Sequence, residues 1–245
     1  MKKIPALIAS TSLLIGSASF ASEFTPAQIN EMRSIVIEEI LNNPQTIIDS
    51  LQKYEIAAQQ KRAEELSKTD KIVLKQLSNE IYNNPNDPTF VNESEFDGTV
   101  IVEFYDYNCK FCRMAAPAVR EVVSEGRIKK VYKEYPILSE ESFQAALVSL
   151  VVYDIAPNRW QEFHYGLLSS NKGASIDTAL ALAEILNLDV DLIKQKINDK
   201  KYEDIIIENS KLANNLSITG TPSYVLRNEI IRGVPQPEEL KNKLR

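Results

Sequence analysis

The chain has few of the residues that build metal sites: two cysteines, Cys109 and Cys112, and one histidine, His164, among 245 residues. A structural zinc ion is usually held by four Cys or His side chains. These three side chains cannot complete that set, so the sequence disfavours a structural zinc site. The two cysteines are therefore left for another kind of chemistry.

Long apolar runs are also scarce. Only residues 4–15 form one, and this run is shorter than the roughly 20 residues that span a bilayer. Lys2 and Lys3 precede the run, and the small residues Ser19 and Ala21 follow it, which is the pattern of a secretory signal. We predict a signal peptide over residues 1–21, cleaved after Ala21, and an exported mature protein.

Positive charge is in deficit. The chain has 28 Lys and Arg residues against 34 Asp and Glu residues, a net charge of -6. Proteins that bind nucleic acids neutralise phosphates with clustered Lys and Arg side chains. No nucleic acid is therefore expected as a partner.

The N-terminal part of the predicted mature chain has the period of helices. Thr25-Pro26 and Asn43-Pro44 each have the signature of a helix start, because a polar cap precedes a proline in the first turn. Residues 44–82 then contain neither glycine nor a further proline, which predicts a long second helix. The first helix carries an apolar stripe at helical spacing, formed by Ile29, Met32, Val36 and Ile40.

This apolar stripe has nothing in its own segment to pack against. We therefore predict a helical oligomerisation arm over residues 22–66, forming a homodimer or homotrimer, and a helical stem and linker over residues 67–88. Ordinary packing of the arm against the rest of the chain remains the alternative.

From residue 89 the pattern changes to that of an α/β domain. We predict an edge strand over residues 89–91, a buried strand over 99–105 and a strand over 130–135. A helix from Cys109 to about residue 125 links the last two, with Met114, Ala118, Val119 and Val122 facing inward, so these strands should be parallel. A helical block over residues 139–216, two strands at 223–226 and 229–232 and a last helix from residue 237 should complete the domain.

The two cysteines form a Cys-x-x-Cys pair between the predicted strand and helix. Cys109 would lie at the helix N-terminus, where free N–H groups favour a thiolate, and the positive charge of Lys110 should favour it further. Cys109 would then exchange disulfides with a client protein, and Cys112 would resolve the mixed disulfide. A structural disulfide across so short a loop would stabilise little. Cu(I) held between the two thiolates stays open as an alternative.

The sequence resembles the DsbA family of bacterial periplasmic thiol oxidoreductases. The likeness rests on Cys109-Lys110-Phe111-Cys112, on the predicted helical insertion and on Thr219-Gly220-Thr221-Pro222-Ser223. It implies a thioredoxin fold over residues 89–245 with a helical insertion at about 139–216. It also implies that Pro222 is cis and lies against the active-site sulfurs, and that Thr221 tunes their redox behaviour.

The resemblance extends to further residues. It makes Glu103 a buried acid that assists proton transfer from Cys112, with Lys133 as its expected partner, although an exposed charge on an alternating strand would also explain either residue. Pro117 resembles a helix-kinking proline of this fold. Lys110 stands where proline is frequent in the family, so Lys110 and Phe111 leave the redox potential open. We interpret His164 as structural.

The N-terminal segment resembles that of ScsC-like members of this family, in which such segments mediate oligomerisation. This implies an isomerase, or a dual oxidase and isomerase, in the periplasm; a monomeric oxidase is the alternative. The expected partners are unfolded or misoxidised exported proteins and a membrane redox partner of the Dsb type. No cofactor is expected beyond the redox-active Cys109–Cys112 pair.

Overall fold

A computed structural model describes residues 24–91, 96, 98–125 and 127–244. The chain forms two compact units, Met1–Gln60 and Lys61–Arg245. The predicted signal peptide, residues 1–21, lies outside the described residues. Within those residues, no helix combines the length and the apolar character needed to cross a membrane.

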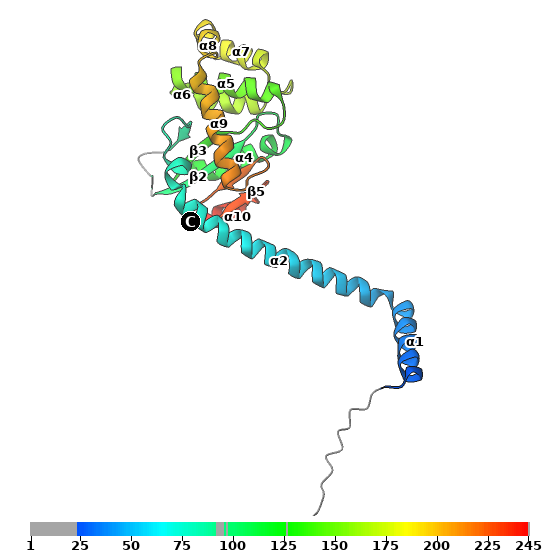
Figure 1. Ribbon diagram of the computed structural model, residues 1–245. Coiled ribbons are helices and arrows are strands. Elements are labelled where there is room, and N and C mark those ends of the chain that lie inside the picture. Colours follow the sequence, from blue (N-terminus) through cyan, green and yellow to red (C-terminus); the bar gives the residue numbers. More distant parts are fainter. Residues whose placement is uncertain (1–23, 92–95, 97, 126, 245) are drawn as a thin grey trace, which may run out of the picture. The chain divides into compact units, whose positions relative to one another are not determined.

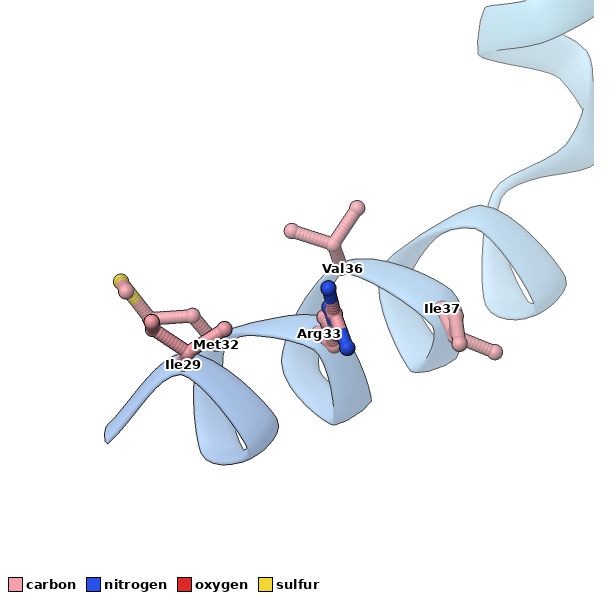
Figure 2. Close-up of a pocket in the computed structure, with 5 residues that line it drawn as sticks. All are labelled: Ile29, Met32, Arg33, Val36 and Ile37. Carbon is pink, nitrogen blue, oxygen red and sulfur yellow. The ribbon is translucent and has the colours of Figure 1, made fainter. Parts of the chain in front are cut away.

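The first unit contains helix α1 (Pro26–Asn42) and the first part of helix α2 (Pro44–Gln76). Helix α1 begins where the sequence predicts: the Thr25 hydroxyl accepts a hydrogen bond from Gln28 N, and the Gln28 side chain accepts one from Thr25 N. No residue of α1 is buried, and its apolar side chains are 38–73% exposed. Figure 2 shows five side chains of this surface along the α1 helix: Ile29, Met32, Arg33, Val36 and Ile37.

Helix α2 is shorter than the predicted helix over residues 44–82. It ends at Gln76, and a separate short helix, α3 (Ser78–Tyr82), follows Leu77. The sequence has no glycine or proline at this point, so helix propensity gave no signal for the break. Leu74 of α2 and Ile81 of α3 are nonetheless buried in the same apolar cluster of the second unit.

The second unit is built around one mixed five-stranded sheet of order β1-β3-β2-β4-β5. The predicted strand–helix–strand unit is confirmed, because β2 and β3 are parallel and joined through helix α4. The other neighbouring strands are antiparallel. The strands are β1 (Thr89–Phe90), β2 (Thr99–Tyr105), β3 (Ile128–Glu134), β4 (Ser223–Val225) and β5 (Ile230–Arg232).

Helices cover both faces of this sheet. On one face, Ile101 and Tyr224 of the sheet pack with Val119 of α4 (Lys110–Glu125) and Leu240 of α10 (Pro237–Lys243). On the other face, Val102, Phe104 and Val131 pack with Leu74, Ile81 and Leu212. Burial on both faces explains why β2 has an almost continuous apolar sequence.

The predicted helical block separates β3 from β4. Figure 1 shows its first four helices gathered together at one end of the second unit. Ser175 and Asp189 cap α7 and α8, as the sequence predicts. The block comprises α5 (Glu140–Ile155), α6 (Pro157–Leu168), α7 (Ile176–Ile185), α8 (Val190–Lys196) and α9 (Lys200–Asn215).

Helix α9 belongs to both parts of the unit. Its first half contributes Ile205 and Ile206 to the core of the helical block, and its second half contributes Leu212 and Ala213 to the core under the sheet. The block is thereby fixed to the sheet, next to the segment that carries the two cysteines.

Candidate active site

A short loop carries the chain from β2 to the cysteines, and Asp106 organises it. The Asp106 carbonyl accepts a hydrogen bond from Cys109 N (3.0 Å). Its carboxylate accepts bonds from the backbone N–H groups of Asn108 (2.7 Å), Ile137 (2.9 Å) and Leu138 (3.0 Å). Every one of these bonds is to backbone, so the loop conformation is fixed directly.

The two cysteines are free thiols at the start of α4. Cys109 is 6% exposed and Cys112 is 1% exposed, so the first sulfur is the more accessible of the two. Cys109 Sγ lies 3.1 Å from the Thr221 carbonyl oxygen, which accepts a hydrogen bond from Cys109 when that thiol is protonated. The Thr221-Pro222 peptide bond is cis. The fold therefore brings together the two motifs singled out in the sequence.

The two thiols have opposite acidities. Hydrogen bonds to the Cys109 sulfur, chiefly from the Cys112 thiol and then from Thr221 and the backbone of α4, lower the pKa of Cys109 to about 5. The same bond with Cys109, followed by burial and the Glu103 charge, raises the pKa of Cys112. At neutral pH the pair thus holds one thiolate, on Cys109, and one proton, on Cys112.

Glu103 lies on β2 and is 3% exposed, so it is not the solvent-facing charge that the alternative interpretation required. Tyr224 donates a hydrogen bond to Glu103 Oε1 (3.0 Å), and Lys130 Nζ lies 2.5 Å from Glu103 Oε2. Burial lowers the pKa of Lys130, but the charge and hydrogen bond of Glu103, together with Tyr165 and Cys112, more than offset this and hold the pKa above its usual value. The carboxylate is thus fully partnered inside the sheet unit.

The expectation that Lys133 pairs with Glu103 is wrong. Lys133 lies opposite Phe104, on the face of the sheet away from Glu103, whereas Lys130 lies opposite Ile101, on the same face as Glu103. Lys133 instead forms a buried ion pair with Asp87 and donates to the Glu80 carbonyl (2.8 Å). Side chains alternate between the two faces of a strand, so the register of β3 against β2 determines that Lys130, and not Lys133, is the partner of Glu103.

Three residues near the cysteines point outward. Lys110 is exposed, and Phe111 and Met114 are 57% and 60% exposed. The prediction that Met114 faces inward is wrong, since Ala115, Val119 and Val122 supply the buried side of α4. Pro117 lies within α4 and is also exposed. Apolar side chains are thus presented at the surface beside the thiols.

Sequence reasoning missed a buried polar network behind the loop. Tyr105 donates a hydrogen bond to Glu134, and the Tyr107 hydroxyl bonds Ser149 Oγ (2.8 Å) and His164 Nδ1 (3.0 Å). Burial raises the pKa of Glu134 to about 8. Tyr105 lies opposite Glu134 in the register of β2 against β3, so the two side chains share a face of the sheet. The alternation of side chains along the two strands was the sequence feature that could have predicted this pair.

His164 belongs to this network. Burial, with a smaller effect of Lys130, holds its pKa well below the usual value, so the ring is neutral. The ring stacks on Trp160 with centroids 4.8 Å apart. These contacts are those of a residue inside a core, in agreement with a structural role.

The donor set for a metal ion is small. In the part of the chain that the structure describes, no three His, Cys, Asp or Glu side chains are grouped to hold an ion. Any soft metal would therefore have the two sulfurs of Cys109 and Cys112 as its ligands.

This arrangement, a thiolate at a helix N-terminus facing a cis-proline loop, defines a thiol-disulfide oxidoreductase site on a thioredoxin-like fold. Residues 100–245 match the family described as the DSBA-like thioredoxin domain. The chain belongs to this family, as its sequence motifs indicated.

Solved structures support the same assignment. A thioredoxin-like oxidoreductase from Silicibacter pomeroyi DSS-3 is 30% identical, with a TM-score of 0.63 over 67% of this chain and 94% of that one. The thiol-disulfide exchange protein alpha-DsbA2 from Wolbachia pipientis is 25% identical, with a TM-score of 0.68 over 73% and 95%. A linker-deletion mutant of Proteus mirabilis ScsC, 20% identical, shares the fold, with a TM-score of 0.66 over 91% and 96%.

A curated relative contains a similar segment within a longer protein. The Na(+)/H(+) antiporter NhaA 3 of Salinispora tropica is 26% identical over 125 residues, which are 51% of this chain and 19% of that protein. The match thus spans about a fifth of the relative's length, and the transport activity in its name is a property of that protein.

Proposed function

We propose that this chain is an exported, periplasmic protein-disulfide oxidoreductase that acts on unfolded or misoxidised proteins. The observation that carries the proposal is the split acidity of the cysteine pair, with a pKa of about 5 for Cys109 and a raised pKa for Cys112. A thiolate that is stable at neutral pH is both a nucleophile and a good leaving group, as thiol-disulfide exchange requires.

The reaction has two exchange steps. When the pair is oxidised, a client thiolate attacks the Cys109 sulfur, the Cys109–Cys112 bond breaks, and Cys112 leaves and takes up a proton. A second client thiolate then attacks the client sulfur of the mixed disulfide and releases Cys109 as a thiolate. The client loses two electrons and the cysteine pair gains them, so a membrane redox partner of the Dsb type must reoxidise the pair.

The surrounding residues have separate roles in this proposal. Thr221 hydrogen-bonds Cys109, and Pro222 follows it across a cis bond in the loop that faces the thiol. Glu103 acts on the other thiol, because its charge raises the pKa of Cys112 and favours the protonated leaving group. Lys110 and Phe111 tune the potential from the exposed turn between the cysteines.

The isomerase part of the proposal rests on the arm. Helix α1 has an apolar surface with no buried residue, and the fold shared with Proteus mirabilis ScsC extends over 91% of the chain. A homodimer or homotrimer formed through this surface would hold several cysteine pairs around one client. Several sites on one client favour reshuffling of wrong disulfides over a single oxidation.

Refolding of scrambled ribonuclease by the full-length protein tests the proposal. The wild type should restore ribonuclease activity in a glutathione buffer, and Cys109→Ser should not. The Cys112→Ser variant should accumulate a mixed disulfide with the client, detected by mass spectrometry. Equal rescue by wild type and Cys109→Ser would overturn the assignment of the site.

A further inference from the structure

An open hollow lies beside the segment that carries Cys109, since the residues on either side of this cysteine, Asn108 and Lys110, both line it. Its volume is about 420 Å³. One wall comes from the loop and first turns of α4, with Asn108, Lys110, Arg113 and Met114. The facing wall comes from the end of α6 and the turn after it, with Leu168, Ser169 and Asn171.

Two hydrogen-bonded links hold the walls of this hollow in place. Arg113 Nε donates to the Leu168 carbonyl (2.7 Å), which joins α4 to the end of α6. Asn108 Nδ2 donates to the Ala174 carbonyl (2.8 Å), and Asn108 Oδ1 accepts from Ala174 N (2.8 Å). The hollow is therefore preorganised on ordered elements, so a ligand need not close it first.

The hollow is lined by positive charge at the N-terminal end of a helix, which is an unusual place for it. Lys110 and Arg113 lie in the first turns of α4, where the helix dipole disfavours cations, and the first turn carries no acidic residue. Neither side chain forms an ion pair within the described ranges, and no carboxylate lines the hollow. A local arrangement that works against helix stability is expected where function requires it.

These observations point to one kind of occupant. We propose that the hollow receives an acidic side chain of the client protein, which makes Arg113 and Lys110 determinants of client preference. The exposed Met114 would contact the aliphatic part of the same side chain. This inference rests on the proposed function, because the client must be bonded to Cys109 at the time.

The position of Arg113 sets where the acid must lie in the client. Arg113 is four residues beyond Cys109, a rise of roughly 6 Å along a helix. An extended client advances about 3.3 Å for each residue. For a client that runs along α4, the preferred Glu or Asp should therefore lie about two residues from the client cysteine.

Three dithiol peptides test the inference. They share one sequence and differ only in carrying Glu, Gln or Lys two residues from the first cysteine. Their oxidation by the oxidised full-length protein is followed by chromatography, and each rate is divided by the rate with glutathione disulfide, which corrects for the acidity of the peptide thiol. We expect the Glu peptide to react about tenfold faster than the Lys peptide at low salt, and the ratio to fall at 0.5 M salt.

Matched variants locate the effect. Arg113→Gln should reduce the Glu-to-Lys ratio to below about twofold, and Lys110→Gln should reduce it in part. Lys211→Gln removes the same charge from an exposed position on α9 outside the hollow and should keep the full ratio. Arg113→Lys keeps the charge and should retain most of the preference, which separates charge from packing.

These outcomes separate the role of the hollow from the proposed function of the protein. Equal corrected rates for all three peptides would overturn the inference and leave the proposed function standing. Failure to oxidise any peptide would overturn both. A ratio that persists in Arg113→Gln with Lys110→Gln would show that the preference arises elsewhere, and would overturn the role of the hollow.

Discussion

Glu103 and Lys130 form a buried ion pair across the parallel strands β2 and β3, with Lys130 Nζ 2.5 Å from Glu103 Oε2. Tyr224 from β4 completes the partners of the carboxylate. The Glu103 charge also acts on Cys112, whose pKa it raises. The pair thus links the stability of the sheet to the protonation of the second thiol.

Replacing Glu103 should separate these two effects. Glu103→Gln leaves Lys130 charged, buried and unpaired, so we expect a loss of roughly 3–5 kcal/mol in the free energy of unfolding, measured with denaturant. The double variant Glu103→Gln, Lys130→Met should recover most of this loss. In both variants the pKa of Cys112 should fall. Titration of the Cys112 thiol measures this when each variant is also given the Cys109→Ser substitution, which leaves one thiol in the protein. A double variant as unstable as the single one would contradict the ion-pair argument.

Thr221 should contribute to the acidity of Cys109, next to the larger effect of Cys112. Alkylation of the reduced protein should show Cys109 reacting with a midpoint near pH 5. Thr221→Val removes the hydroxyl, so the midpoint should move upward and the rate at pH 5 should fall several-fold. Thr219→Val makes the same chemical change at an exposed position of the same loop and should leave the profile unchanged. Identical profiles for Thr221→Val and wild type would assign the low pKa to α4 alone.

Glu134 should make the oxidised protein less stable as pH rises. Its folded pKa of about 8 is raised from an ordinary value of 4.5, so the proton that it binds in the folded state is lost on unfolding, and stability declines as pH rises toward 8. Between pH 6.5 and 8 we expect a loss of roughly 2 kcal/mol. In Glu134→Gln this decline should be absent.

The reduced protein provides the internal control for Glu134. The pKa of Cys109 is lowered from 9.0 to about 5, so its contribution to stability grows with pH between these values and opposes that of Glu134. The reduced wild type should therefore show a flatter profile between pH 6.5 and 8 than the oxidised wild type. Denaturant unfolding of both forms at several pH values measures this. Parallel profiles would refute the assignment of the two groups.

The apolar surface of α1 should hold the proposed oligomer together. Val36→Glu with Ile40→Glu places charges on side chains that are 56% and 43% exposed in the single chain, so the fold of the chain should survive. Light scattering should show that the oligomer dissociates to monomers, with loss of isomerase activity and retention of peptide oxidation. Ser34→Glu adds a charge on the other side of α1 and should leave the mass unchanged. A wild type that is itself monomeric would refute the oligomer.

The sequence was most informative where one local pattern decides the structure. The caps at Thr25, Ser175 and Asp189 and the cysteine pair needed no knowledge of distant residues. The partner of Glu103 did need it: Lys130 and Lys133 are equally plausible until the register of β2 against β3 is known. The same limit hid the pair of Tyr105 and Glu134, whose hydrogen bond joins residues 29 positions apart.

The sequence pattern also did not predict which side chains near the cysteines are exposed. Met114 lies on a helix with an apolar side, and its period alone placed it inward with Val119. The structure leaves it 60% exposed beside the thiols, because smaller residues such as Ala115 fill the contact with the sheet. A surface for clients and a buried core draw on the same apolar residue types, so a pattern of hydrophobicity cannot separate them.

Thr221, whose side-chain hydrogen bond lowers the pKa of Cys109, lies 112 positions after that cysteine, on the other side of the helical block. A ribosome therefore completes the cysteine pair well before it adds the loop that helps to stabilise the thiolate. A chain that is only partly synthesised carries both sulfurs without the full acidity of the first one. The full acidity of Cys109 therefore depends on a residue that is synthesised after the whole helical block.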